Sequence, residues 1–193
     1  VIAGVVERFK GEGGRVTGVY CRIDTDYHAP RETADCCGEF GSIDCAFTNA
    51  GVGGPLLPLG EYPEEGWDEV IATNLTSVFR GCKYALPHMT AQKSGSIINM
   101  AAAQGHIGPD GWTAYAGAKG AVMAMTRQMA VELGPLNIRV NSISPGTINT
   151  PMNDKLVKEI GGNLSKAWVK MHPLGRTGEP SGVASGVRMR ASG

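Results

Sequence analysis

Tyr115 and Lys119 are the two residues whose types and spacing best fit a chemical role. They lie four positions apart in residues 114–133, a proline-free segment rich in Ala, Met and Leu that predicts a helix. Residues four apart share one helix face, and a neighbouring ammonium lowers the pKa of a phenol from its usual value near ~10. A tyrosine tuned in this way can exchange a proton with a substrate oxygen. The alternative is a solvated Tyr–Lys pair on the outside of an amphipathic helix.

A strand and a loop must place this helix. Ile97, Ile98 and Met100 follow Gly95 as a short apolar run, which predicts a strand buried on both faces. Residues 101–113 then form a loop with several glycines and a Pro-Asp-Gly turn. We expect this loop to fold over the reacting end of a substrate.

Strands and helices alternate along the rest of the chain. This alternation predicts one α/β domain with a parallel sheet and helices on both faces. In such sheets ligands bind beyond the carboxyl ends of the strands, so the segments that follow the strands are expected to meet at one edge. The predicted strands are 15–23, 42–48, 96–100 and 138–143, and the predicted helices are 28–40, 64–89 (kinked or closed at Pro87), 114–133 and 181–190.

Composition excludes several classes of function. The 193 residues carry 18 basic and 18 acidic side chains with no block of like charge, so there is no nucleic-acid footprint. No apolar run approaches the ~20 residues of a membrane span, and no secretory leader precedes Val1. The five cysteines are odd in number and unevenly spaced, which indicates a reduced, cytoplasmic protein. They lack metal-ligand spacing, so no metal site is expected.

Three further motifs accompany Tyr115 and Lys119. They are Thr48-Asn49-Ala50-Gly51 after an apolar run, Asn74-Leu75 in a helix, and the segment from Pro145 to Met152 after another apolar run. In this order and at these spacings the set resembles the short-chain dehydrogenase/reductase family, over most of the chain. The resemblance implies a Rossmann-like doubly wound sheet and an NAD- or NADP-dependent oxidoreductase that interconverts a secondary alcohol and a ketone.

The resemblance also implies roles for the catalytic residues. Tyr115 is expected to act as acid/base, Lys119 to lower its pKa and hold the cofactor ribose, and Asn74 to hold a water that links Lys119 to solvent. A purely structural role for Asn74 is the alternative, because a buried amide must find partners to avoid a loss of stability.

Cofactor contacts are implied along the loops that follow the strands. Asp24 is the candidate for the adenine ring, with Asp26 two residues away, and either aspartate is alternatively a loop or N-cap residue. The 48–51 and 145–150 segments are alternatively ordinary turns. The full set of implied cofactor contacts is Asp24, Asn49, Ala50, Gly51, Tyr115, Lys119, Pro145, Gly146, Ile148 and Thr150.

The sequence departs from the family pattern at two places. Ala102 occupies the position of the family's catalytic serine, thirteen residues before Tyr115; His106, Gln104 and Thr113 lie in the same loop and could donate instead. The family's glycine-rich phosphate turn and its last strand have no counterpart in residues 1–193. We therefore expect a partial domain, incomplete at both ends, with the choice between NAD and NADP left open.

Two further expectations concern partners. The apolar stretch 152–171 is expected to cover a modestly hydrophobic substrate, such as a cyclic alcohol, a sugar or a steroid-like ketone. Helices 64–89 and 114–133 build oligomers in the family, so a dimer or tetramer is expected. The rival function is a catalytically impaired protein that keeps these helices for oligomerisation or binding, and Ala102 favours this rival.

Overall fold

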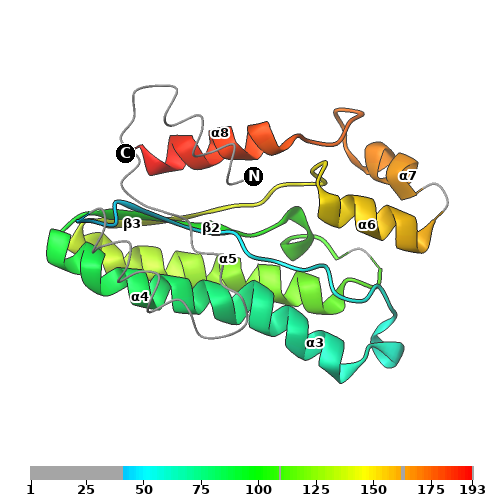
Figure 1. The fold of residues 1–193 in the computed structure, drawn as a ribbon, viewed down its shortest axis with the longest axis horizontal. Helices are drawn as coiled ribbons and strands as arrows, with labels where there is room; N and C mark the ends of the chain where they lie inside the picture. Colours follow the sequence, from blue (N-terminus) through cyan, green and yellow to red (C-terminus); the bar gives the residue numbers. More distant parts are fainter. Residues whose placement is uncertain (1–40, 109, 162–163, 193) are drawn as a thin grey trace.

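A parallel sheet forms the centre of the molecule. The structure is a computed structural model and describes residues 41–108, 110–161 and 164–192. Strands β1 (Cys45–Thr48), β2 (Gly95–Met100) and β3 (Ile138–Ile143) lie in the order β1-β2-β3, all parallel (Figure 1). This confirms the predicted parallel α/β fold. The predicted segments 15–23 and 28–40, with Asp24 and Asp26, lie outside the described residues.

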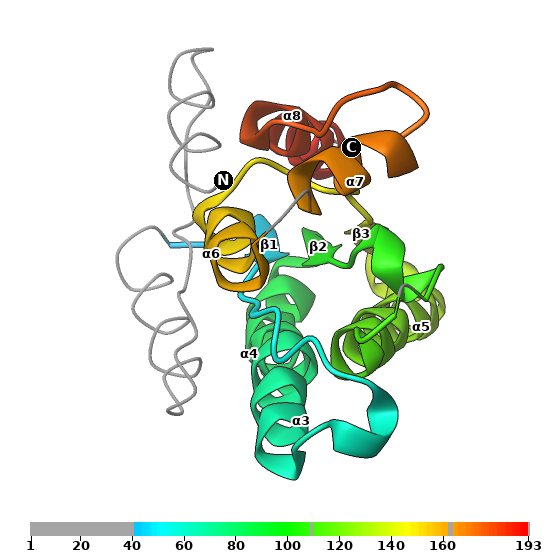
Figure 2. The same cartoon turned by 90° about the vertical axis from the view of Figure 1, so that its right-hand side faces the viewer.

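Helices cover both faces of this sheet, as the alternation predicted. Helices α4 (Ser77–Gln92) and α5 (Thr113–Leu133) pack on one face, and α8 (Pro180–Ala191) packs on the other (Figure 2). Helices α6 (Pro151–Ile160) and α7 (Leu164–Met171) follow β3 and lie beyond the end of the sheet (Figure 1). The lid expected over 152–171 is therefore a pair of helices.

The middle strand is buried on both faces because it is flanked by strands and covered by helices. Ile97 and Ile98 are fully buried, which explains the continuous apolar run. Asn99 is also fully buried, and its side chain accepts from the Thr48 hydroxyl at 2.8 Å and donates to Thr126 Oγ1 at 3.0 Å. These bonds satisfy a polar side chain in the core and tie β1 and α5 to β2.

The helix expected over 64–89 differs from the prediction. It comprises α3 (Glu64–Ile71), a π-helical turn (Ala72–Thr76) and α4, which continues past Pro87 to Gln92. An internal proline costs about 3 kcal/mol, but Ala85 and Met89 are buried on either side of it. Their packing holds the helix together, so the expected closure at Pro87 was wrong.

The first described strand is shorter than the predicted 42–48. It begins at Cys45, because the backbone N–H and C=O of Ile43 pair with the side-chain amide of Gln92 and not with a strand. The predictions for β3, α5 and α8 agree with the structure within one residue at each end.

Candidate active site

The loops that follow β2 and β3 run side by side at the carboxyl end of the sheet. Ala101 N–H donates to Ile143 C=O and Ala103 N–H donates to Pro145 C=O, both at 2.9 Å. These bonds extend the ladder beyond the strands and hold Ala102 next to the segment that begins at Pro145. The predicted meeting of the two loops at this edge is confirmed.

Asn74 is fixed on the π-helical turn by two hydrogen bonds. Its Oδ1 accepts from Val52 N–H and its Nδ2 donates to Val52 C=O, both at 2.8 Å, and the residue is fully buried. The extra residue of a π-helical turn re-aims side chains and is frequent at functional sites. Here Asn74 ties helix α3–α4 to the loop after β1, which is the structural role that the sequence left open.

Gly51 stands between Asn74 and Lys119. A Cβ built on Gly51 would lie 3.3 Å from Asn74 Oδ1 and 3.7 Å from Lys119 Nζ. The polar atoms of the two predicted catalytic residues therefore approach the same point from opposite elements. The absence of a side chain at Gly51 lets both atoms lie close to its backbone.

Lys119 is held in place by the end of the central strand. Its ammonium donates to Met100 C=O at 2.8 Å, and only 2% of the residue is exposed. Burial lowers the pKa of Lys119 from 10.5 to about 8. An ammonium has three donors, and Met100 is its only hydrogen-bond acceptor among the described residues.

Tyr115 packs one turn before Lys119, on the buried face of α5. Its ring packs edge-on against the Trp112 ring, with 5.1 Å between the ring centroids. Tyr115 also belongs to an apolar cluster with Val70 and Ala102. Lys119 Nζ lies 5.8 Å from the centre of the Tyr115 ring. The two side chains therefore share one face, as predicted from their spacing, and the alternative of a solvated pair is wrong because both are buried.

The expected lowering of the Tyr115 pKa is not present. Burial raises the pKa of Tyr115 to about 12, because an apolar cluster disfavours the phenolate. No group in the described part of the chain hydrogen-bonds to its hydroxyl. The phenol is thus protonated at neutral pH and has a free donor.

The burial of Lys119 makes stability depend on pH. Between pH 8 and 10.5 the unfolded chain binds more protons at this lysine than the folded one, so folding becomes more favourable as pH rises. The raised pKa values of Cys45 and Cys82 act in the opposite direction above pH 9, and that of Tyr115 does so above pH 10. We expect the free energy of unfolding to gain about 2 kcal/mol from Lys119 between pH 8 and 10, and Lys119→Met to remove this gain.

Urea unfolding at several pH values tests this expectation. Lys170→Met, at an exposed position on α7, is the matched control and should keep the pH dependence of the wild type. An equal pH dependence in the wild type and in Lys119→Met would show that Lys119 does not contribute this gain.

Ala102 lies in the same buried apolar cluster as Tyr115. It has extended backbone dihedrals (φ −162°, ψ 156°), is 4% exposed and packs in the Tyr115 cluster. Of the three residues considered as replacement donors, His106 is exposed and lies 3.4 Å from Ser144 Oγ, and Thr113 is exposed at the start of α5. No described contact links any of the three, Gln104 included, to Tyr115.

The segment 145–150, which we call the Pro-Gly loop, is fastened from two sides. Pro145 C=O is bonded to Ala103 as above, and Asn153 Nδ2 donates to Ile148 C=O at 2.6 Å. Thr150 is the N-cap residue of α6, but its side chain makes no capping bond. The helix therefore does not use its hydroxyl.

His172 is a residue of this site that the sequence did not single out. It follows α7 and contacts the Pro-Gly loop from a position 25 residues further along the chain. The only signal is the His-Pro-Leu-Gly stretch at 172–175, which by itself indicates a turn.

The residues present fit a nicotinamide dinucleotide. Within the residues that the structure describes, Lys119 has two donors beyond its bond to Met100 and the Tyr115 hydroxyl has no hydrogen-bond partner, and both Asn74 and Lys119 lie close to the backbone of Gly51. Ribose hydroxyls could accept from such donors. Asn49 and Ala50, which follow β1, are half-buried beside Gly51, and Asp24 lies outside the described residues.

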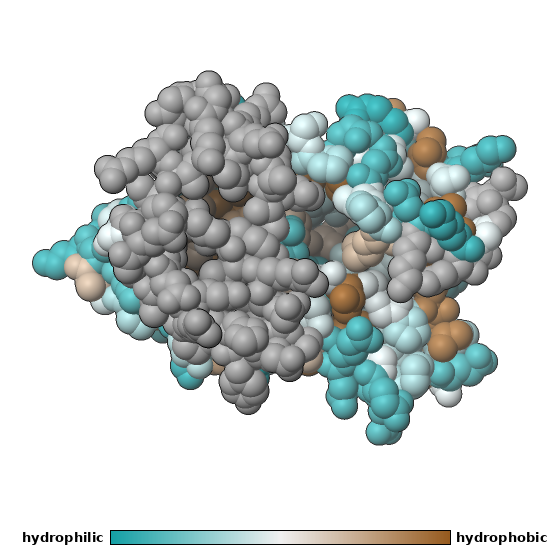
Figure 3. Space-filling model, viewed as in Figure 1, coloured by the Kyte–Doolittle hydropathy of each residue, from teal (hydrophilic) through white to brown (hydrophobic). Residues whose placement is uncertain are grey.

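Apolar side chains reach the surface around α6 and α7. Met152, Met171 and Leu174 are 42%, 59% and 80% exposed. The space-filling view shows small apolar patches among hydrophilic surface on the side where these helices lie (Figure 3). The apolar cover expected over 152–171 stays a prediction.

The residues that the structure describes lack two other kinds of site. No three His, Cys, Asp or Glu side chains gather there as a metal ion would require. None of the described helices combines the length and the apolar character needed to cross a membrane.

Comparisons with known proteins cover nearly the whole chain. The family described as enoyl-(acyl carrier protein) reductase matches residues 3–192. The chain is 39% identical to 3-oxoacyl-[acyl-carrier-protein] reductase FabG of Chlamydia pneumoniae, over 93% of this chain and 71% of that protein. It is 41% identical to 5-keto-D-gluconate 5-reductase of Escherichia coli, over 74% of this chain and 55% of that protein.

Solved structures have the same fold. Levodione reductase superimposes with a TM-score of 0.83 at 33% identity, over 88% of this chain and 67% of that chain. NAD+-bound xylitol dehydrogenase has a TM-score of 0.81 at 29% identity, over 86% and 68%. ElxO with NADP bound has a TM-score of 0.83 at 27% identity, over 90% and 71%.

Proposed function

The chain belongs to the short-chain dehydrogenase/reductase family, and we propose that it is an NAD- or NADP-dependent reductase of ketones with Tyr115 as the acid. One observation carries this proposal. Tyr115, Lys119 and Asn74 come from two separate helices, yet Asn74 and Lys119 meet beside Gly51 and Tyr115 lies one turn from Lys119. A protein that only binds or oligomerises has no need to bury a lysine and an asparagine beside the same glycine.

A protonated Tyr115 is suited to the role of acid in the reduction of a ketone. Burial holds the pKa of Tyr115 at about 12, so the phenol is protonated at neutral pH and can donate to a carbonyl oxygen. Bound nicotinamide would supply the hydride for the carbonyl carbon. The Lys119 ammonium would stabilise the phenolate that remains after the transfer, and Asn74 positions the loop after β1 around the two residues.

The cofactor and substrate classes follow from the relatives. The neighbouring structures include one that is NAD+-bound and one with NADP bound, so both cofactors are candidates. The named relatives reduce a 3-oxoacyl carrier protein, a ketogluconate and levodione, all of which are carbonyl compounds. With the apolar cover around α7, we propose a cyclic or sugar-like ketone of modest polarity.

A binding titration followed by a turnover assay tests the proposed function. The fluorescence of NADH and of NADPH is followed as protein is added, and cofactor oxidation is then measured with a cyclic ketone, a ketogluconate and a 3-oxoacyl thioester. We expect saturable binding of one cofactor and oxidation with at least one ketone. Absence of binding to both cofactors would overturn the proposal.

The rival is a catalytically impaired protein that uses its helices to oligomerise. Ala102 favours it, because the family's serine hydroxyl would otherwise help to polarise the carbonyl. The rival predicts cofactor binding without turnover. The two functions therefore differ in the second step of the same assay.

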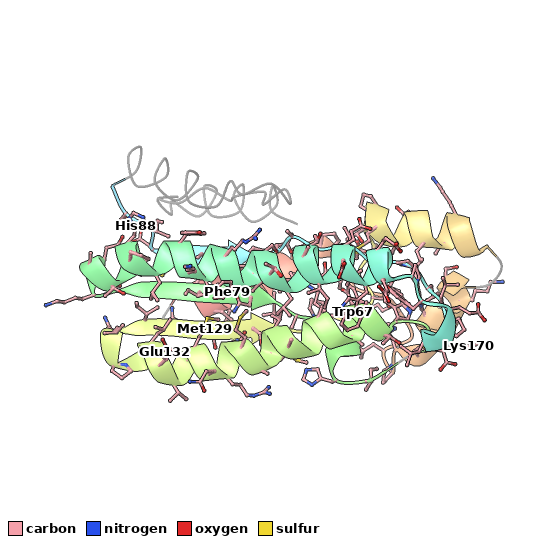
Figure 4. All side chains as sticks on the ribbon, turned by 90° about the horizontal axis from the view of Figure 1, so that it is seen from below. Trp67, Phe79, His88, Met129, Glu132 and Lys170 are labelled. Atoms are coloured by element: carbon pink, nitrogen blue, oxygen red, sulfur yellow. The ribbon has the colours of Figure 1, made fainter. Side chains whose placement is uncertain are left out.

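An oligomer is proposed under either function. Figure 4 shows Trp67 of α3, Phe79 of α4 and Met129 of α5 along the outer side of the paired helices. Trp67 is 42% and Phe79 50% exposed, although large apolar side chains gain ~1.5–3 kcal/mol on burial. A second copy of the chain that packs on these helices would cover them, as a dimer or tetramer would.

Phe79→Asp is expected to dissociate this oligomer, because it replaces an apolar ring with a charged carboxylate that would have to leave water on association. The mass of the particle is measured by size-exclusion chromatography with light scattering. The matched control is Leu174→Asp, which places the same charge at a more exposed residue away from α4 and α5. If Phe79→Asp keeps the mass of the wild type, these helices are not the interface.

A further inference from the structure

The Pro-Gly loop pairs with a segment that lies after α7. Ile148 and Gly178 form an isolated parallel bridge. Gly178 N–H donates to Thr147 C=O at 2.8 Å, and Asn149 N–H donates to Gly178 C=O at 2.9 Å. The second half of the loop is therefore fixed by backbone bonds, independently of any side chain.

The first half of the loop is fixed by His172. Its Nε2 lies 3.0 Å from Thr147 N, and its Nδ1 lies 2.6 Å from Trp168 C=O. A carbonyl oxygen only accepts, so Nδ1 carries the proton; the Thr147 N–H only donates, so Nε2 must be unprotonated. The imidazole is thus neutral, and it joins the last turn of α7 to the loop.

Gly146 makes room for this imidazole. A Cβ built on Gly146 would lie 2.6 Å from His172 Nε2. The absent side chain thus serves the approach of His172 and not only the approach of a cofactor. The bond from Ala103 N–H to Pro145 C=O holds the backbone before Gly146, and the bond from Thr147 N–H to His172 Nε2 holds the backbone after it.

We propose that His172 is a positioning residue that sets the backbone of the Pro-Gly loop for the cofactor. This inference rests on the proposed function, in which that loop holds the nicotinamide end. It also explains how α7, which covers the substrate side, is coupled to the loop. His172 acts through Thr147 and touches neither cofactor nor substrate in this role.

Two substitutions of His172 test the roles of its two ring nitrogens one at a time. In His172→Gln the side-chain oxygen reaches the place of Nε2 and can still accept from Thr147 N–H. In His172→Asn the shorter amide reaches only the place of Nδ1, so Trp168 keeps a partner and Thr147 does not. Gly146→Ala displaces the imidazole and should behave as His172→Asn does.

Amide hydrogen exchange and cofactor affinity are the two measurements. We expect exchange of the Thr147 amide to be about tenfold faster in His172→Asn, because a buried donor loses its partner, and nearly unchanged in His172→Gln. The Ala101 amide, bonded within the sheet edge, reports global unfolding and should not change. The Kd for NADH or NADPH should rise by about tenfold in His172→Asn and less than about threefold in His172→Gln.

The outcomes separate the two parts of the inference. Equal Thr147 exchange in the two variants would overturn the bond to Nε2 as the element that holds the loop. Different exchange with equal Kd would overturn a role of His172 toward the cofactor. If the wild type binds neither cofactor, the proposed function and the cofactor role fall together, whereas Thr147 exchange still decides whether His172 holds the loop.

Discussion

Replacement of Tyr115 by Phe is expected to lower turnover by about 10²–10⁴-fold, the range that a positioned general acid contributes. The substitution removes only the hydroxyl and keeps the ring that packs against Trp112 and Val70. Because that hydroxyl has no partner within the described residues, its removal should leave the free energy of unfolding equal or slightly higher. Cofactor oxidation gives the turnover and urea unfolding gives the stability.

Tyr62→Phe is the matched control for this prediction. Tyr62 packs against the same apolar cluster but from its edge, and it is half-buried. The control should keep the turnover of the wild type. Turnover that survives in Tyr115→Phe, in a protein that binds cofactor, would show that another group donates the proton.

Ala102→Ser is expected to raise turnover by about 10²–10³-fold, the amount lost when one preorganised donor is removed from comparable sites. Ala102 lies in the same apolar cluster as Tyr115 and is 4% exposed, so an added hydroxyl would be shielded from water. The chain already places an extended backbone there, which serine adopts without strain. The gain should therefore appear in kcat, with little change in the affinity for the cofactor.

Ala103→Ser, one residue further in the same loop, is the control for a nonspecific effect of a hydroxyl. It should leave turnover unchanged. No gain in Ala102→Ser, on protein shown to bind cofactor, would refute the idea that the missing hydroxyl limits the rate. If the wild type has no detectable turnover and Ala102→Ser has some, the result would support the rival function, in which the natural chain is catalytically impaired.

The two predictions together distinguish the competing functions. The reductase requires that Tyr115→Phe loses activity that the wild type has. The impaired protein requires that the wild type has none and that Ala102→Ser creates it. Both require the geometry in which Lys119 and Asn74 meet beside Gly51.

Local patterns in the sequence determined much of the fold. The β3 strand at Ile138–Ile143 and the helix that carries Tyr115 and Lys119 follow from apolar periodicity and helix propensity, which act within a few residues. The shared face of Tyr115 and Lys119 follows from helical geometry alone. The order of strands and helices then required the loops after β2 and β3 to meet at one edge.

Contacts between distant residues decided the rest. The sequence placed Lys119 beside a phenol of lowered pKa, whereas the structure buries Tyr115 against Val70 and Ala102 and raises that pKa. Asn74 lies in a π-helical turn, where its side chain pairs with the backbone N–H and C=O of Val52, 22 residues away. His172 reaches Thr147 only because α7 folds back over the loop. Burial and hydrogen-bond partners depend on groups far apart in the chain, and no local pattern carries that information.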